Sequence, residues 1–126
     1  MNKLGFIGQQ LNDVLSVPYE FGQWNSDIQY PYFVGEVTEE PIYTEDGFEQ
    51  SQFLLTGFHR GALIDLEEIK EKIKKHFDPI YGLRDSDEDG TIIVFYEGAF
   101  YIPTGEADLK KIQINLSIKE WKGAVY

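Results

Sequence analysis

The chain has 126 residues and carries 22 acidic against 11 basic side chains, for a formal net charge of −11. A surface of this charge repels nucleic acid and anionic membranes, because binding to either depends on Lys and Arg. The chain contains no cysteine, which excludes disulfides, thiolate zinc sites and a cysteine nucleophile. No apolar run approaches the ~20 residues that span a bilayer. We therefore expect a single domain over residues 1–126, without sequence-specific nucleic-acid binding and without a membrane span.

The first half of the chain predicts one helix followed by strands. Apolar residues recur at helical spacing over residues 3–15, and Pro18 ends the helix because the residue before a proline avoids the α region. The rest of this half predicts, in chain order, a short extended piece over 17–21, a strand over 30–37, a long connection over 39–49 with an Asp46-Gly47 turn, and a returning strand over 52–58.

The clearest predicted element is a helix over residues 64–77. Its apolar residues form one stripe, and acidic residues precede basic ones, as the helix dipole favours. Asp65 is placed to cap the helix and Glu68 follows three residues later, which is the spacing of a capping box. Ile64 and Ile69 have the spacing of a hydrophobic staple.

The second half predicts strands around an acidic loop. Residues 84–90 form the loop, 91–96 a central strand, Glu97-Gly98 a tight turn, 99–102 the returning strand, and 111–119 a strand with strict alternation of apolar and polar residues. The element order is therefore α-β-β-β-α-β-β-β. We expect an α+β domain, in which two helices pack on a mostly antiparallel sheet.

The acidic loop matches half of a calcium-binding motif. Asp85, Asp87 and Asp89 alternate before a glycine, as in the first half of an EF-hand loop. The twelfth position is Tyr96 instead of glutamate, and the following element predicts a strand instead of a helix. We prefer a solvated acidic turn, and keep calcium at these three aspartates as the alternative.

No enzyme motif is present. His59 and His76 are the only histidines, and neither lies in a metal-binding or catalytic pattern. No nucleophile elbow, phosphate-binding loop or dinucleotide fingerprint occurs. We expect a non-catalytic protein without a cofactor.

Aromatic residues gather around the strand at 30–37. Tyr30, Tyr32 and Phe33, with Trp24 nearby, form a candidate interface, because Tyr and Trp favour interfaces. Ordinary core and edge packing is the simpler explanation for the same residues. The link over 58–61 and the polar face of the strand at 111–119 are equally open candidates.

In its order of elements, the chain resembles the tail terminator, or tail completion, proteins of long-tailed bacteriophages and prophages. The resemblance lies in the helix that runs into Val17-Pro18-Tyr19, the segment YPYFVGE at 30–36, the strands and helix through residue 102, and the strand from Leu109 to Trp121. It covers most of the chain. It implies a sheet with flanking helices and no catalytic residues.

The resemblance also implies an assembly. Members of this family form a hexameric ring that caps the tail tube and offers a docking face to the head connector. The protein would then reside in the virion tail, and in the host cytoplasm during assembly. A negative surface would suit a lumen through which DNA slides. The rival reading from another class is an acidic inhibitor or immunity-type protein that binds a basic partner.

Overall fold

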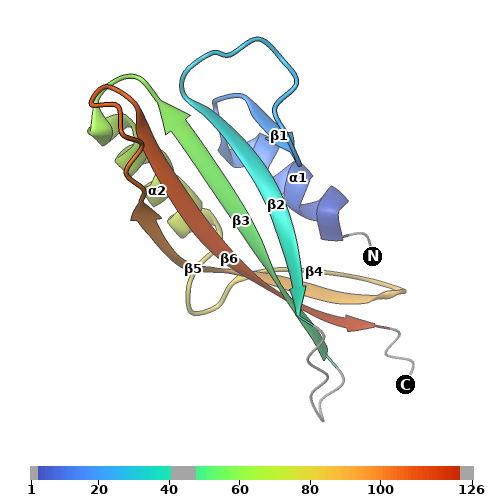
Figure 1. Cartoon of the computed structure of the whole chain (residues 1–126). Helices are drawn as coiled ribbons and strands as arrows, with labels where there is room; N and C mark the ends of the chain where they lie inside the picture. Colours follow the sequence, from blue (N-terminus) through green and yellow to red (C-terminus); the bar gives the residue numbers. More distant parts are fainter. Residues whose placement is uncertain (1–2, 41–47, 123–126) are drawn as a thin grey trace.

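The computed structural model describes residues 3–40 and 48–122 of the chain. Two helices and six strands form one α+β arrangement, and the predicted order α-β-β-β-α-β-β-β is confirmed (Figure 1). The Asp46-Gly47 turn lies outside the described residues. The elements are α1 (Lys3–Val14), β1 (Tyr19–Phe21), β2 (Tyr32–Glu40), β3 (Phe48–His59), α2 (Leu63–His76), β4 (Leu83–Asp87), β5 (Gly90–Tyr101) and β6 (Lys110–Lys122).

The six strands form a single sheet in the order β1-β2-β3-β6-β5-β4. Every neighbouring pair is antiparallel except β1 and β2, which run parallel. The last strand of the chain therefore lies in the middle of the sheet, between β3 and β5. Both helices pack on the same face, behind the sheet as drawn in Figure 1.

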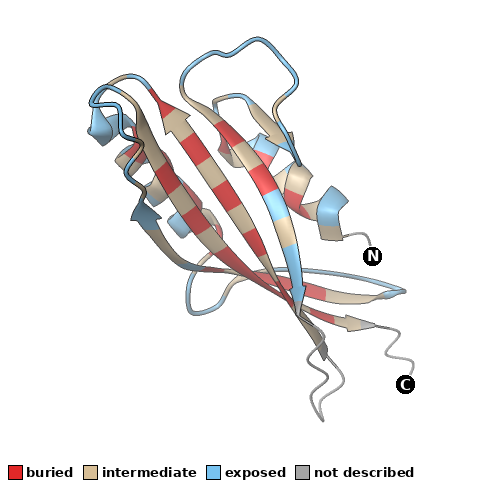
Figure 2. Cartoon of the chain, viewed as in Figure 1, coloured by how far each residue is buried: buried red, intermediate tan, exposed pale blue. Residues whose placement is uncertain are grey.

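Alternation along the strands decides which side chains enter the core. Successive residues of a strand point to opposite faces, so on the central strands one face is mostly apolar and faces the helices. On β6, Ile112, Ile114, Leu116 and Ile118 are fully buried, as the alternation over 111–119 predicts. Figure 2 shows the resulting pattern, in which buried positions alternate with less buried ones along the central strands.

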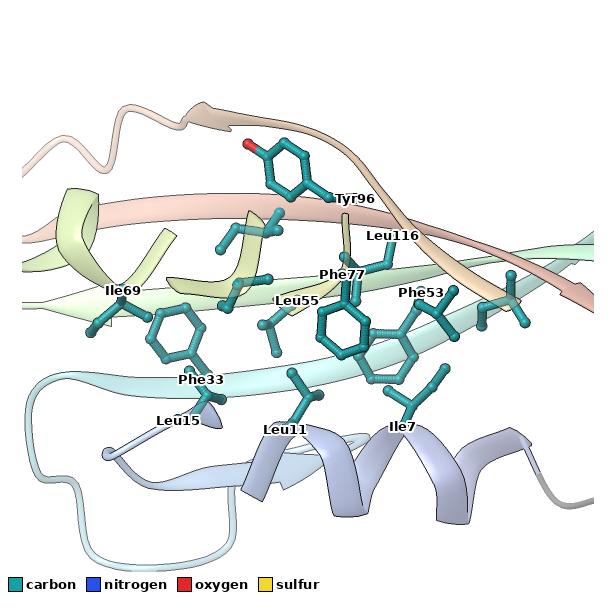
Figure 3. Packing of buried hydrophobic residues seen from close by; sticks show 14 of the residues in the cluster. Ile7, Leu11, Leu15, Phe33, Phe53, Leu55, Ile69, Phe77, Tyr96 and Leu116 are labelled. Carbon is teal, nitrogen blue, oxygen red and sulfur yellow. The ribbon is translucent and has the colours of Figure 1, made fainter. Parts of the chain in front are cut away.

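The helices close the core from one side. Ile7 and Leu11 of α1 lie in one hydrophobic cluster with the inward residues of the sheet (Figure 3), and Leu66 and Ile73 of α2 belong to the same cluster. Each of these four side chains is completely buried. Full burial of an aliphatic side chain contributes ~1.5–3 kcal/mol, so this layer supplies much of the drive to fold.

The predicted start of the second helix is wrong. The helix α2 begins at Leu63, its N-cap is Ala62, and no side chain caps it. Asp65 lies inside the first turn, where its Oδ2 atom is 2.8 Å from Nε2 of His59. Ile64 is 58% exposed, so it makes no staple with the buried Ile69. The histidine at the end of β3 thus engages the carboxylate that the sequence assigned to the cap.

The strands around the acidic segment also differ from the prediction. The sequence predicts two strands within residues 91–102, joined at Glu97-Gly98, but β5 is one strand through Tyr101. The register against β6 shifts between Tyr96 and Gly98, so Glu97 is the extra residue of a β-bulge. The sixth strand is instead β4, which forms from part of the expected acidic loop.

Candidate functional site: the open face of the sheet

One face of the sheet has no helix over it among the described residues. Its side chains alternate with the core residues and point away from α1 and α2. We call this surface the open face. Its central part comprises Tyr32, Val34 and Glu36 of β2, Leu54, Thr56 and Phe58 of β3, and Lys111, Gln113, Asn115, Ser117 and Lys119 of β6.

The open face carries few acids in a protein whose net charge is −11. Between Gln50 and Phe58, β3 presents only amide, hydroxyl and apolar side chains to this side. On β6 the charged groups of this face are Lys111 and Lys119. Depletion of charge together with enrichment of aromatic residues is the compositional mark of protein interfaces. This surface therefore differs from the rest of the molecule in the direction that association requires.

Aromatic rings gather at one end of the open face. We call Trp24, Tyr30, Tyr32 and Phe58 the aromatic cluster. The ring of Tyr32 lies 4.7 Å from that of Trp24 and 5.7 Å from that of Tyr30, measured between centroids. It stacks on Phe58, with centroids 5.0 Å apart and an interplanar angle of 19°. Nζ of Lys111 lies 5.4 Å from the centroid of Phe58, within range of a cation–π interaction.

Arg60 fixes the edge of this cluster. Its guanidinium donates to Asp108 at 2.8 Å, to Glu106 at 3.0 Å and, through Nε, to the Tyr30 hydroxyl at 3.3 Å. The hydrogen bond from Arg60 lowers the pKa of Asp108. One side chain thus ties the loop after β5 to the loop before β2, and it holds the Tyr30 ring at the surface.

A hollow of about 280 Å³ opens beside the cluster. The indole N–H of Trp24 is buried and has no hydrogen-bond partner among the described residues. A buried donor without an acceptor costs free energy. The hollow is lined by Trp24, Tyr32, Val34, Glu36, Thr56, Phe58 and Lys111.

The predicted interface residues separate into two groups. Tyr30 and Tyr32 belong to the aromatic cluster, and their role in an interface stays a prediction. Phe33 is fully buried in the core, so its assignment to the same surface is wrong. Tyr32 and Phe33 are neighbours on β2, and neighbouring side chains of a strand point to opposite faces. The candidate link over 58–61 supplies two members of the site, Phe58 and Arg60.

The acidic segment forms the strand β4 and its turn into β5. Oδ1 of Asp87 accepts from the backbone N–H groups of Asp89 at 2.8 Å and Gly90 at 3.2 Å. Oδ1 of Asp85 accepts from the N–H of Ser86 at 2.9 Å. Within residues 3–40 and 48–122, no three His, Cys, Asp or Glu side chains converge as metal ligands would. Asp87 therefore stabilises the hairpin turn between β4 and β5.

The two histidines connect elements. His59 is buried and binds Asp65, which joins the end of β3 to the start of α2. His76 lies at the other end of α2, where its Nε2 is 2.8 Å from Oε1 of Gln10 on α1. The two imidazoles therefore lie at opposite ends of the same helix, and each has a structural partner.

The sequence patterns did not predict an exposed apolar pair in the loop between α2 and β4. Ile80 and Tyr81, in the loop between α2 and β4, are 74% and 81% exposed and are the most exposed large apolar side chains of the described chain. Their exposure follows from the geometry of the turn, which the periodicity of apolar residues in the sequence does not predict.

Comparisons with known proteins give no family for this chain. No protein-family model matches the sequence, and no curated protein matches it significantly. Across the part of the chain that the structure describes, neither helix has the length and apolar character needed to cross a bilayer.

Proposed function

We propose that this protein is a structural subunit of a long-tailed bacteriophage, which assembles with copies of itself into a ring that caps the tail tube. The proposal combines the sequence resemblance to tail terminators with one property of the fold. That property is the open face, which is poor in acids and rich in aromatic residues on an otherwise acidic protein. Neighbouring copies would cover this face in the ring.

The size of the open face supports assembly through it. The strands β3, β5 and β6 are each 12 or 13 residues long. Together with β2 they make four strands. At ~3.4 Å per residue and ~4.8 Å between strands, these four strands present roughly 40 by 19 Å, or about 760 Å². A stable protein interface buries about 800 Å² on each partner. One such contact on each side of a subunit is enough to hold a ring.

The charge of the chain supports the same role. A ring on a tail tube surrounds the path of the DNA, and a negative surface keeps DNA from binding to the wall. The exposed turn of β4 and β5 contributes Asp85, Asp87 and Glu88 to this charge.

The test is tube capping. Purified tail tubes of uncontrolled length are mixed with the protein and imaged by negative-stain electron microscopy. The proposal expects a ring of density at one end of each tube, and tubes that no longer elongate when free tube protein is added. Tubes that stay uncapped and continue to grow would refute the role in the tail.

The acidic charge also favours a second candidate, an inhibitor that binds a basic partner. The two candidates differ in stoichiometry. An inhibitor of this kind binds as a monomer or dimer and leaves tail tubes unchanged. A tail protein caps the tube and forms a ring.

A further inference from the structure

The loop between α2 and β4 presents two apolar side chains on a fixed turn. Oδ1 of Asp78 accepts hydrogen bonds at 2.8 Å from the backbone N–H groups of both Ile80 and Tyr81. The N–H of Gly82 donates to the carbonyl of Asp78 at 2.9 Å. The turn is therefore held in place from within, although the side chains of Ile80 and Tyr81 are 74% and 81% exposed.

Packing prevents this turn from folding inward. Gly82 has a φ of +70°, and a Cβ there would lie 2.7 Å from Cγ2 of Ile93. The backbone thus lies directly against β5, with no room for the two apolar side chains to be buried beneath it. A large apolar pair that is both rigid and exposed is suited to a contact, because ordering it in advance lowers the cost of binding.

The molecule carries a complementary hollow elsewhere. The hollow of about 280 Å³ beside the aromatic cluster is about nine times the ~30 Å³ that one water molecule occupies in the liquid, so it has room for a phenol ring. It offers aromatic walls, the carboxylate of Glu36 and the ammonium group of Lys111. A tyrosine hydroxyl both donates and accepts, and so matches this set.

A single chain does not fill its own hollow. The hollow lies on β2, β3 and β6, whereas the loop that carries Tyr81 leads into the edge strand β4, and its Gly82 packs against β5. Along β6, the hollow extends from the row of Lys111 to the row of Asn115, whereas Gly82 packs on Phe95, which lies in the row of Ser117. Across the sheet, β3 and β6 separate β5 from the β2 wall of the hollow, a distance of about 14 Å at ~4.8 Å between strands.

We propose that Ile80 and Tyr81 of one copy insert into the hollow beside the aromatic cluster of a second copy. This inference rests on the proposed ring assembly and names its contact. Because the protruding pair and the hollow are different surfaces of the same chain, the contact is heterologous. Repetition of a heterologous contact closes into a ring when the rotation between copies allows it.

Cysteine crosslinking tests this contact, because the chain contains no cysteine of its own. Tyr81→Cys and Val34→Cys place single thiols on the protruding pair and in the hollow. A short bismaleimide should link the two variants when they are mixed, and should link neither variant alone. Asn12→Cys, on an exposed position of α1, is the control and should give no product with Val34→Cys. The double variant Tyr81→Cys/Val34→Cys should give a ladder that ends at one ring size.

A mixture that gives no covalent heterodimer overturns the inference, as does equal crosslinking of Tyr81→Cys with itself. Size measurements separate this failure from that of the proposed function. If the wild-type protein forms a ring but the mixture of variants is not crosslinked, the ring assembly stands and the proposed contact is wrong. Crosslinking without tube capping keeps this contact and refutes the role in the tail. In sizing experiments Tyr81→Ala should weaken association at least tenfold, and Tyr81→Phe should weaken it less.

Discussion

Tyr32 and Phe58 face each other across β2 and β3, and their rings stack with centroids 5.0 Å apart on the open face of the sheet. The pair connects the first strand of the hairpin to the strand that leads into α2. It also forms part of the wall of the hollow, next to Lys111. A stacked pair of this kind supplies area and rigidity at once, which suits a contact surface.

Replacing Tyr32 by Ala should weaken self-association roughly thirtyfold, or about 2 kcal/mol, because central aromatic residues carry much of the energy of an interface. The variant should remain folded, since Tyr32 lies outside the core. Thr38→Ala, on the same face of β2 but six residues from Tyr32, is the matched control and should weaken association much less. Light scattering over a concentration series measures both. Equal association of the two variants would remove the aromatic cluster from the interface.

Replacing Phe33 by Ala should destabilise the fold of the subunit, whereas replacing Tyr32 acts on association. This side chain is fully buried, so its loss should reduce the free energy of unfolding by about 3–5 kcal/mol. Urea denaturation of Phe33→Ala and Tyr32→Ala compares two neighbouring aromatic residues on one strand. A larger loss of stability for Tyr32→Ala would show that the faces of β2 are assigned the wrong way round.

Two glycines on the strands offer another matched pair. A Cβ at Gly57 would lie 2.3 Å from Cε2 of Phe33, whereas a Cβ at Gly98 would meet nothing within 4 Å. Gly57→Ala should therefore lower the free energy of unfolding by about 1–3 kcal/mol, since the Phe33 ring must shift in a packed core. Gly98→Ala should cost less than half as much. Thermal melting of both variants, followed by circular dichroism, gives the comparison, and equal losses would contradict the packing of Phe33 on Gly57.

The turn at Asp78 should make stability depend on pH. Hydrogen bonds from the backbone N–H groups of Tyr81 and Ile80 lower the pKa of Asp78 below its ordinary value. The folded state therefore binds fewer protons at this carboxyl than the unfolded state does. The stabilisation is complete above the ordinary carboxyl range, and it is lost as the pH falls from about 5 towards 2.

Asp78→Asn separates this effect from the titration of the other carboxyl groups. The amide oxygen still accepts hydrogen bonds, but the side chain no longer titrates. Urea unfolding of both proteins at pH 6 and pH 3 should show a larger loss of stability at low pH for the wild type. Identical losses would mean that the carboxylate of Asp78 adds nothing to the turn.

The regular parts of the fold follow from local pattern. The helix stripes and the alternation on β6 depend on side-chain periodicity, which the sequence contains in full. The bulge at Glu97 was beyond such reasoning, because a Glu-Gly pair is compatible with a turn and with an extra residue in a strand. The strand β4 was missed because its acidic side chains suggest a solvated loop, whereas pairing with β5 decides its conformation.

The site was only partly predictable, because long-range strand pairing brings its residues together. Tyr30 and Tyr32 are visible as a local aromatic group, but Phe58 and Lys111 reach them only through the registers of β2 with β3 and of β3 with β6. The assignment of Asp65 to the helix cap failed for a similar reason, since the capture of its carboxylate by His59 is a tertiary contact. Adjacent aromatic residues on a strand, such as Tyr32 and Phe33, belong to different faces.

The claim that this protein forms a ring of identical copies is tested most directly by its mass in solution. Light scattering behind a sizing column, across a concentration series, should give either a hexamer or an equilibrium between monomer and hexamer. Addition of purified tail tubes should shift that equilibrium towards the ring. A protein that remains strictly monomeric at every concentration and also on tail tubes would contradict the account.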